Sequence, residues 1–412
     1  MARKGRNIVL GLDMGTTKVS ALIGEIHEDG MVDVVGIGSH ICSGLQKGVV
    51  ANMDRTVDAI AKAVEEAQIM ADVEVDSAYV SLAGPHIHGI NSTGIIAVKN
   101  QEITGREIES VLEAARVVAL PEDREIIHVL PQEFVVDDQG GILEPPIGMS
   151  ATRLEARVHI VTVTMAAANN VVKCVNKAGF EVEDLVLEQL AVSDSTLNAD
   201  ERDAEVLLVD IGGGSTNIAL LSNGGLTFTA VLGVGGAHIT KDLAIGLNTS
   251  VPDAEQIKRA HGCAFVPLVH DRDVIEVNFS GNHETERIRR LDVCEIIEPR
   301  AEEIFQMVLS EVSDSGRDTE MVSHVVLTGG TASLEGIVEL AEEVFQVPVR
   351  RGIPSGIEGL SEIVKSPVHA TGAGLLLFAA KQYQGRLHQF AGQGFFGRFC
   401  HRVREWFTEF VS

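Results

Sequence analysis

Hydrophobic and polar residues follow two different periodic patterns along the chain. Short apolar runs bounded by turn residues predict β-strands, and longer segments in which apolar residues recur every three or four positions predict amphipathic helices. The expected strands are residues 7–13, 18–26, 32–38, 77–82, 157–164, 205–210, 217–222, 226–232 and 324–328. The expected helices are residues 53–71, 104–119, 166–178, 253–261, 297–313, 333–346 and 370–384. This alternation is typical of an α/β protein.

One pattern, an apolar strand followed by an Asp-x-Gly turn and a second apolar strand, occurs twice. The first copy, IVLGLDMGTTKVSALIGEI, begins at Ile8, and the second, EVLLVDIGGGSTNIALLS, begins at Glu205. Either turn alone could be an ordinary tight turn, because Gly accepts positive φ and Asp and Thr are common in turns. A chance turn does not recur together with both flanking strands. The sequence therefore predicts two lobes that each carry one copy.

The two turns contain the groups that a magnesium-bound triphosphate requires. Glycines let backbone N–H groups approach phosphate oxygens, hydroxyls donate hydrogen bonds to them, and carboxylates hold the metal through its water shell. Asp13 and Asp210 are therefore the expected Mg²⁺ residues, on opposite sides of a cleft. The expected phosphate-binding residues are Gly15, Thr16, Thr17 and Lys18 in the first turn and Gly212, Gly213, Gly214, Ser215 and Thr216 in the second. Neither turn matches a Walker motif or a dinucleotide fingerprint.

Three regions interrupt the regular alternation. Residues 84–162 contain a helical pattern and extended segments separated by Pro and Gly, which predicts an inserted subdomain of mixed strands and one helix. Residues 268–292 predict strands and a turn inside an otherwise helical region. Between Phe378 and Phe395 the chain is rich in Gln, Gly, His and Arg, a composition typical of a linker.

Composition excludes several classes of protein. The formal net charge of −26 argues against non-specific nucleic-acid binding, which relies on basic surfaces. The five cysteines lie far apart without a CxxC motif, which favours free thiols in a reducing cytoplasm. The basic N-terminus reaches Asp13 after only a few apolar residues, and no apolar run approaches the ~18 residues of a membrane span. We therefore expect a protein that is neither secreted nor transmembrane.

The C-terminal segment GFFGRFCHRVREWFTEFVS has a helical aromatic stripe. The stripe residues are Phe396, Phe399, Val403, Trp406, Phe407 and Phe410. Arginines occupy the opposite face, and the segment is cationic in an acidic chain. An amphipathic helix of this kind either packs on the core of its own protein or lies on a membrane surface. The preceding polar linker, the change in charge and the bulky aromatic face favour reversible membrane attachment.

Two later motifs, LTGGTASL at Leu327 and ATGAG at Ala370, follow the repeated hairpins in the order found in the ATPase superfamily of actin, sugar kinases and heat-shock chaperones. The segments GLDMGTTKV, LAGPHI, VDIGGGSTNIA, GVGGAHITKDLAIGL, AEQIKRAHG and LTGGTASLEG together resemble the FtsA family of bacterial cell-division proteins. The resemblance spans essentially the whole chain. It implies an actin-like two-lobed α/β ATPase fold of duplicated ribonuclease-H-like domains, with an inserted α+β subdomain and a C-terminal amphipathic helix.

The resemblance also implies a division of the chain into subdomains. The first lobe comprises residues 1–83, 163–192 and 370–385, with residues 84–162 as its inserted subdomain 1C. The second lobe comprises subdomain 2A, residues 193–236 and 304–369, and subdomain 2B, residues 237–303. Residues 386–394 are the expected linker, and residues 395–412 are the expected membrane-targeting helix.

Further nucleotide-binding residues follow from the resemblance alone. Gly235 and Gly236 match contacts to the ribose and phosphates, and Gly329 and Gly330 match the loop that closes over the adenosine. Glu255 and Lys258 match a pair that flanks the ribose and adenine, although such an i,i+3 pair is equally typical of a solvated helix face. Glu188 matches a carboxylate near the attacking water and is the candidate catalytic residue. It is followed by Gln189 where a proline is expected, and a Glu that ends an apolar run is often a surface residue.

The function that the resemblance implies is that of an ATP-binding, filament-forming adaptor with at most slow ATP hydrolysis. It would anchor the FtsZ ring to the cytoplasmic face of the inner membrane at the division septum and recruit later division proteins through the inserted subdomain. In the segment CEIIEPRAEEIF, Arg300 and Glu303 match residues implicated in binding the C-terminal peptide of FtsZ. Pro299 is expected in the first turn of that helix.

Two other functions share the same fold. An actin-fold enzyme would be a chaperone ATPase or a sugar kinase; the former needs a substrate-binding domain after the ATPase, and the latter needs a carboxylate base and a polar sugar pocket. A pilus-assembly ATPase homologue usually lacks a terminal aromatic helix, and MreB-like filaments differ in the inserted subdomain. The adaptor function is therefore favoured.

Overall fold

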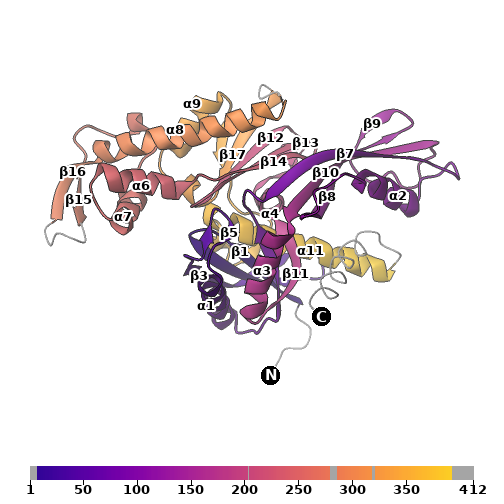
Figure 1. The fold of residues 1–412 in the computed structure, drawn as a ribbon, viewed down its shortest axis with the longest axis horizontal. Coiled ribbons are helices and arrows are strands. Elements are labelled where there is room, and N and C mark those ends of the chain that lie inside the picture. The colour runs from indigo at the N-terminus through magenta and orange to yellow at the C-terminus, as the bar shows by residue number, and fades with distance from the viewer. Residues whose placement is uncertain (1–6, 203, 279–284, 318–320, 392–412) are drawn as a thin grey trace.

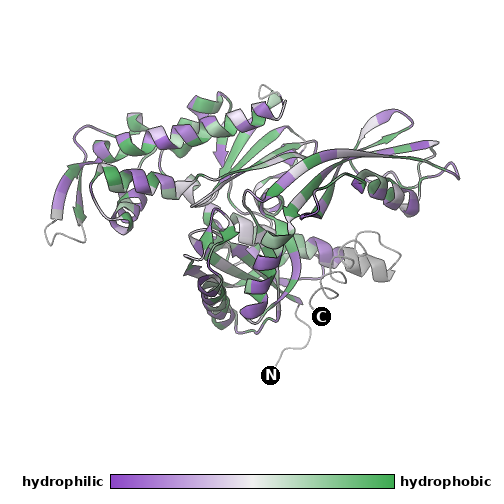
Figure 2. Ribbon diagram, in the orientation of Figure 1, coloured by the Kyte–Doolittle hydropathy of each residue, from purple (hydrophilic) through white to green (hydrophobic). Residues whose placement is uncertain are grey.

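The computed structural model describes residues 7–202, 204–278, 285–317 and 321–391. The chain forms two lobes, and a third body, the insert (residues 84–162), extends from the first lobe alongside the second (Figure 1). Apolar residues fill the strands of each lobe, whereas the outer helices alternate apolar and polar residues (Figure 2). The two-lobed α/β architecture with an inserted α+β subdomain confirms the predicted fold class.

The first lobe is built on a six-stranded sheet of order β11-β6-β1-β2-β3-β19. Its strands are β1 (Asn7–Met14), β2 (Lys18–Ile26), β3 (Val32–Ile41), β6 (Ser77–Leu82), β11 (Glu181–Leu187) and β19 (Glu358–Gly359), with a short hairpin of β4 (Leu45–Gln46) and β5 (Val49–Val50). Its helices are α1 (Met53–Ala71), α3 (Met165–Lys177), α4 (Glu188–Thr196) and α11 (Ala370–Ala391). Successive strand residues point to opposite faces, so Ile23 packs with α1 and α3 while Leu22 packs with α11.

The second lobe repeats this arrangement around a five-stranded sheet of order β14-β13-β12-β17-β18. Its strands are β12 (Val206–Ile211), β13 (Thr216–Ser222), β14 (Gly225–Leu232), β17 (His324–Thr328) and β18 (Val349–Arg351), with a hairpin of β15 (Val274–Asn278) and β16 (Thr285–Arg289). Its helices are α5 (Ala199–Arg202), α6 (Gly236–Gly246), α7 (Val251–His261), α8 (Arg290–Asp314) and α9 (Ile337–Phe345), whereas α10 (Ser361–Val364) follows β19 and packs on the first lobe. In both lobes the first strand pairs antiparallel with the second and parallel with a later strand, β6 or β17. The duplication predicted from the hairpins is therefore present.

The insert contains a four-stranded sheet of order β7-β10-β8-β9 and one helix, as the sequence predicts. Its elements are β7 (Ile87–Ala97), α2 (Gly105–Arg116), β8 (Arg124–Val136), β9 (Gln139–Ile142) and β10 (Arg153–Thr164). Thr104 and Glu107 form a capping box that starts α2. Pro131 lies beside a register shift in β8, which accommodates its missing N–H.

Two expected boundaries differ from the structure. Helix α8 begins at Arg290, so Pro299 lies inside it rather than in its first turn; its φ near −65° suits a helix, and the structure tolerates the lost hydrogen bond. Helix α11 continues to Ala391, beyond the helix end expected at residue 384, so residues 386–391 are helical, and the linker over residues 386–394 stays a prediction. Polar residues such as Gln and Arg are good helix formers, and Gly385 alone costs about 1 kcal/mol.

None of the helices in the described ranges has both the length and the apolar character that crossing a bilayer requires. The predicted membrane-binding stripe, Phe396, Phe399, Val403, Trp406, Phe407 and Phe410, lies outside the described residues. Its role remains a prediction from the sequence.

Candidate functional site

The two Asp-x-Gly turns meet at their tips between the lobes. A Cβ atom on Gly213 would lie 2.3 Å from Thr17 Cγ2, and one on Gly214 would lie 2.5 Å from Thr16 Cγ2. A side chain at either glycine would push the turns apart, so glycine is required there for this close approach. The fold thus brings together two turns that lie about half the chain apart in sequence.

A cavity of about 90 Å³ lies between the turns. Of the predicted nucleotide-binding residues, its wall contains Asp13, Gly15, Thr16, Thr17, Lys18, Glu188, Asp210, Gly212, Gly213, Ser215, Gly329 and Gly330. The other wall residues are Met14, Gly48, Ala83, Pro367, Val368 and Thr371. Small-molecule pockets usually measure about 300–1,000 Å³. The lobes are therefore closed in this structure and must separate to admit a whole nucleotide.

Three carboxyl groups reach the cavity from separate elements: Asp13 on β1, Asp210 on β12 and Glu188 at the start of α4. Burial raises the pKa of Asp13, which outweighs the charge of Lys18 and the 3.3 Å hydrogen bond from Ser81 Oγ. Burial raises the pKa of Asp210 to about 7, and the charge on Asp13 adds to this. Burial, then Asp210 and Asp13, raise the pKa of Glu188 well above its ordinary value. A cation would stabilise this cluster of acids.

Glu188 is held in place rather than directed to solvent. Its Oε1 accepts a hydrogen bond of 3.2 Å from Thr371 Oγ1 at the start of α11, and it shares a hydrogen bond with Asp210. The adjacent Gln189 is 1% exposed and donates from Nε2 to the carbonyl of Ala230 on β14 at 3.2 Å. The surface position considered for Glu188 from its sequence is therefore wrong.

Lys18 supplies positive charge to the cavity wall. Burial lowers the pKa of its ammonium, and the negative charge of Asp13 only partly offsets this effect. Within the part of the chain that the structure describes, no carboxylate oxygen is recorded within 4.0 Å of Lys18 Nζ. A half-buried ammonium without an ion pair suits an anionic ligand such as a phosphate.

Glycines open the wall formed by the second lobe. Gly329 has a φ of +86°, and a Cβ there would lie 2.1 Å from Asp210 Oδ1. At Gly330 a Cβ would meet no atom within 4 Å. The backbone at this position therefore faces open space beside the acids, where a ligand can approach it closely.

The other predicted residues form a cluster next to the cavity. The Gly236 N–H donates to the carbonyl of Gly212 at 2.9 Å, which ties the start of α6 to the second turn. Lys258 Nζ lies 3.0 Å from the carbonyl of Gly236 and 2.7 Å from a Glu255 carboxylate oxygen. A Cβ on Gly235 would lie 2.6 Å from the Gly212 carbonyl. None of these four predicted residues contributes to the cavity wall.

Two further predicted phosphate-binding residues support the second turn instead of lining the cavity. Thr216 is fully buried, and its hydroxyl donates to the carbonyl of Val234 at 2.9 Å. Gly214 provides the contact with Thr16 described above. Both residues therefore stabilise the shape of the second turn, and neighbouring residues of that turn line the cavity.

The predicted FtsZ-peptide residues lie elsewhere, on α8. Arg300 Nε donates to Asp242 Oδ2 on α6 at 2.6 Å, and Arg300 also pairs with Glu303 one turn along its own helix. Both pairings raise the pKa of the guanidinium. Arg300 therefore links α6 to α8, whereas the Glu303 carboxylate is half exposed.

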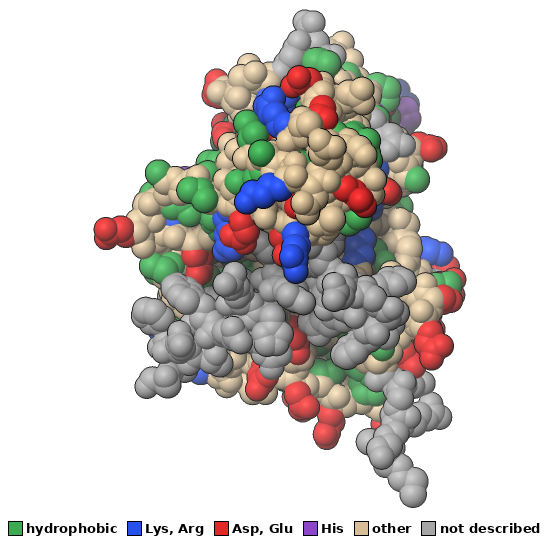
Figure 3. All heavy atoms as spheres, turned by 90° about the vertical axis from the view of Figure 1, so that its right-hand side faces the viewer, with side chains coloured by type: hydrophobic (Ala, Val, Ile, Leu, Met, Phe, Trp, Pro, Cys, Tyr) green, Lys and Arg blue, Asp and Glu red, His purple; other side chains and the backbone are tan. Residues whose placement is uncertain are grey.

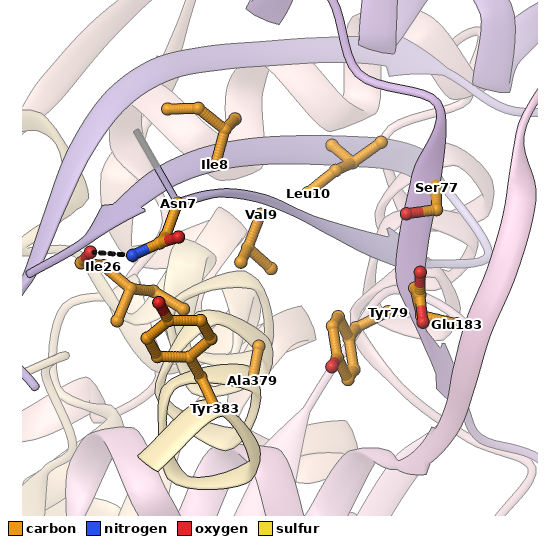
Figure 4. Close-up of a pocket in the computed structure, with 10 residues that line it drawn as sticks. All are labelled: Asn7, Ile8, Val9, Leu10, Ile26, Ser77, Tyr79, Glu183, Ala379 and Tyr383. Atoms are coloured by element: carbon orange, nitrogen blue, oxygen red, sulfur yellow. Dashed lines mark hydrogen bonds between the residues drawn. The ribbon is translucent and has the colours of Figure 1, made fainter. Parts of the chain in front are cut away.

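A second cavity, of about 180 Å³, lies at the far end of β1, between the first-lobe sheet and α11. Tyr79, Tyr383 and Glu183 border it among apolar side chains (Figure 4). It contains none of the predicted nucleotide-binding residues, so its larger size does not make it the nucleotide site.

The chemistry of the first cavity fits a magnesium nucleotide. It combines three acids with raised pKa values, one ammonium and glycine backbone that a ligand can approach. Among the described residues, no three His, Cys, Asp or Glu side chains form a direct metal-ligand set. Coordination of Mg²⁺ through water by Asp13 and Asp210 therefore stays a prediction.

Several wall residues were missed from the sequence. Thr371 and Ala83 lie within the motifs ATGAG and LAGPHI, so their position in those motifs was a usable signal. Pro367 and Val368 carry no such signal, because only the packing of the residues before α11 against both turns brings them to the cavity.

The duplicated sheets and the site between them define an actin-like ATPase fold, and solved structures share it. The chain matches the PilM–PilN type IV pilus biogenesis complex with a TM-score of 0.63 at 18% identity, covering 90% of this chain and 98% of that one. It matches MreB5 of Spiroplasma citri bound to ADP with a TM-score of 0.54 at 13% identity, covering 92% and 98%. At these identities the likeness shows the fold alone. Proteins of this class generally bind a nucleotide with Mg²⁺.

Sequence comparisons identify the family. The family model described as "Cell division protein FtsA" matches residues 207–374, and that of the "SHS2 domain inserted in FTSA" matches residues 84–162. The chain is 44% identical over 389 residues to the cell division protein FtsA of Pseudomonas aeruginosa, covering 94% of this chain and 93% of the relative. It is 36% identical over 385 residues to FtsA of Escherichia coli K12, covering 92% and 91%. The chain belongs to the FtsA family of cell-division proteins.

Proposed function

We propose that the cleft binds ATP with Mg²⁺. Asp13 and Asp210 hold the water shell of the metal, and Lys18 with the backbone N–H groups of the two turns binds the phosphate oxygens. The metal supplies the charge that lets both carboxylates stay ionised. The single observation that carries this proposal is the convergence of both turns on one cavity lined by buried acids and an ammonium.

The ribose and base are assigned to the neighbouring cluster. Gly235, Gly236, Glu255 and Lys258 lie directly behind the second turn, where lobe separation would extend the cavity. Gly329 and Gly330 form the side that approaches the adenosine. This assignment rests on the family resemblance together with the proximity of the cluster to Gly212.

Hydrolysis is proposed to be slow. Glu188 is the candidate base for an attacking water, but its pKa lies well above its ordinary value and its carboxyl shares a hydrogen bond with Asp210. A raised pKa reduces the fraction of ionised carboxylate that can accept a proton from water. Single-turnover hydrolysis by Glu188→Gln tests the assignment: an unchanged rate removes Glu188 from the mechanism.

The proposed cellular role is that of an adaptor between the FtsZ polymer and the membrane. Family membership favours this role over a chaperone, a sugar kinase or a pilus-assembly ATPase. The C-terminal peptide of FtsZ is proposed to bind at Arg300 and Glu303 on α8, and the cationic aromatic segment 395–412 is proposed to lie on the anionic cytoplasmic face of the inner membrane at the septum.

The insert and the second lobe are proposed to make head-to-tail contacts between copies of the chain. Contacts of this kind add one copy after another and build an open filament rather than a closed ring. The insert's end of the molecule exposes acidic, basic and apolar side chains side by side (Figure 3). Apolar insert residues with large exposed fractions are Ile95, Val117, Leu143, Ile147 and Met149. The insert is also the proposed contact for later division proteins. The predicted subdomain boundaries and the linker over residues 386–394 stand as proposals.

Co-flotation tests the adaptor role directly. Purified FtsZ, Mg–ATP and anionic liposomes are mixed with or without this protein, and the lipid fraction is collected by density-gradient centrifugation. FtsZ is expected to float only with this protein, and FtsZ lacking its C-terminal peptide is the matched control and is expected to stay at the bottom. If full-length FtsZ stays at the bottom while this protein floats, the adaptor role is wrong.

A further inference from the structure

One edge of the second-lobe sheet is covered by the insert. Strand β14 is the outermost strand of that sheet, and an edge strand presents unpaired backbone groups. Two insert side chains bond to carbonyls of this strand: Asn91 Nδ2 donates to the carbonyl of Thr227 at 3.1 Å, and Gln132 Nε2 donates to the carbonyl of Leu226 at 3.0 Å. The Thr227 carbonyl also accepts from Arg317, which lies outside the insert. The insert is covalently part of the first lobe, because β7 follows β6 and β10 leads into α3. It therefore bridges the two lobes.

His159 lies at the centre of this contact and is 2% exposed. Its Nδ1 lies 2.7 Å from Asn91 Oδ1, and its Nε2 lies 2.9 Å from Thr229 Oγ1 on β14. Asn91 Oδ1 also accepts from Gln132 Nε2 at 3.2 Å. The network is satisfied when Nδ1–H donates to Asn91 and Nε2 accepts from the Thr229 hydroxyl, so a neutral imidazole completes it.

Two glycines, one in the insert and one in β14, allow the insert and β14 to lie in close contact. A Cβ on Gly89 of β7 would lie 2.4 Å from His159 Nε2 and 2.5 Å from Thr229 Oγ1. A Cβ on Gly225, at the start of β14, would lie 3.0 Å from Gln132 Cα. The insert backbone at Gly89 thus lies against the Thr229 side chain of β14, and the β14 backbone at Gly225 lies against the insert backbone at Gln132. Side chains at these two glycines would separate the insert from β14.

The same strand leads into the nucleotide site. Beyond Leu232, the end of β14, the chain reaches Gly235 within three residues, and the next N–H, of Gly236, bonds to the second turn. Gln189, beside Glu188, donates to the carbonyl of Ala230 near the C-terminal end of β14. The strand that the insert holds therefore continues directly into the backbone that surrounds the cavity.

We propose that the insert is a latch on β14 that holds the lobes closed, so that release of Asn91, Gln132 and His159 from this strand accompanies nucleotide exchange. This rests on the proposed nucleotide binding in the cleft. The closed cavity is too small for a whole nucleotide, so the lobes must rotate. Because the insert moves with the first lobe and β14 with the second, rotation about the α4–α11 connection changes this contact. A partner that draws the insert away from β14 would speed exchange, and bound nucleotide would hold the insert in place, since coupling is reciprocal.

Stopped-flow release of a fluorescent ATP analogue from the full chain tests the latch. The double variant Asn91→Ala/Gln132→Ala removes the bonds to the Leu226 and Thr227 carbonyls from positions at the rim of the insert. Nucleotide dissociation is expected to be at least fivefold faster than in the wild type. Thr93→Ala is the matched control, since Thr93 is exposed on the same face of β7 as Asn91, and its release rate is expected to be unchanged.

Hydrogen exchange of residues 225–232 in the nucleotide-free proteins provides a second measurement. Exchange there is expected to be faster in the double variant than in Thr93→Ala. Wild-type release rates in the double variant, or unchanged exchange in β14, would overturn the latch. If the wild type binds no nucleotide, the proposed function fails, while hydrogen exchange still reports whether the insert clamps β14.

Discussion

Gly374 of α11 lies against Ala191 of α4 so closely that a Cβ atom on the glycine would be 1.8 Å from the Ala191 carbonyl oxygen. These two helices connect the lobes, and α4 begins with Glu188 while α11 begins beside Thr371. The contact therefore sets the distance between two elements of the cavity wall, at the point about which the lobes can rotate.

Gly374→Ala is expected to lower the free energy of unfolding by about 2 kcal/mol, because an added methyl group forces these helices apart. The same shift is expected to weaken nucleotide binding. Gly105→Ala is the control: it lies at the start of α2 with no atom within 4 Å of its Cβ position, and Ala favours a helix. Urea denaturation of both variants checks this, and equal stability would show that the helices adjust without cost.

Lys18→Met is expected to weaken nucleotide binding without destabilising the nucleotide-free protein. Nucleotide affinity should fall at least tenfold, because a charge-assisted bond to phosphate is lost. The nucleotide-free protein should be no less stable, because the half-buried ammonium lacks an ion pair among the described residues. Equilibrium titration and thermal melting measure both effects. Lys62→Met, which removes an exposed Lys62–Asp58 pair of 2.7 Å, should change neither, and normal binding by Lys18→Met would remove Lys18 from the site.

The FtsZ-peptide assignment predicts different outcomes for two neighbouring residues. Glu303→Lys should weaken peptide binding with little change in melting temperature, because its carboxylate is half exposed. Arg300→Glu should weaken binding and also lower the melting temperature, because it places a second acid beside Asp242. Fluorescence anisotropy with a labelled peptide provides the affinities. Gln306→Lys changes charge on the same helix as a control, and equal affinities for all three variants would move the site elsewhere.

The membrane prediction concerns the C-terminal stripe. Trp406→Glu should abolish flotation with anionic liposomes, because a carboxylate replaces a large apolar contact at the lipid boundary. Trp406→Phe, which keeps an aromatic side chain, should float. High salt should weaken wild-type binding only in part, because it screens the arginines and not the apolar face. Normal flotation of Trp406→Glu combined with a lower melting temperature would place the segment in the protein's own core.

The buried His159 is expected to make the free energy of unfolding fall as the pH is lowered. Burial, together with the charge of Arg317, lowers the pKa of its imidazole from 6.5 to about 4. As the pH falls, the unfolded chain takes up this proton first, so the contribution of His159 to stability is complete above pH 6.5 and is lost between about 6.5 and 4. The loss integrates to about 3 kcal/mol. Urea denaturation across this range should show a smaller loss for His159→Gln, which stays neutral, and identical pH profiles would contradict the assignment.

The local pattern of the sequence determined the elements that carry the phosphate chemistry. Both Asp-x-Gly hairpins, the strands around them and the helix of the insert follow from periodicity and turn residues, because such features depend on neighbours a few positions away. Helix ends were less well determined. The extension of α11 to Ala391 and the position of Pro299 inside α8 depend on packing that tolerates a poor helix residue.

Only the tertiary structure decided which distant residues share an environment. Glu188, Asp210 and Asp13 acquire raised pKa values because the fold buries them together, and no spacing in the sequence encodes that burial. The insert is recognisable as a separate segment from composition, yet its docking on β14 arises from side chains of β7, β8 and β10 meeting an edge strand of the other lobe. Contacts of this kind depend on how completed sheets pack, which local sequence does not specify.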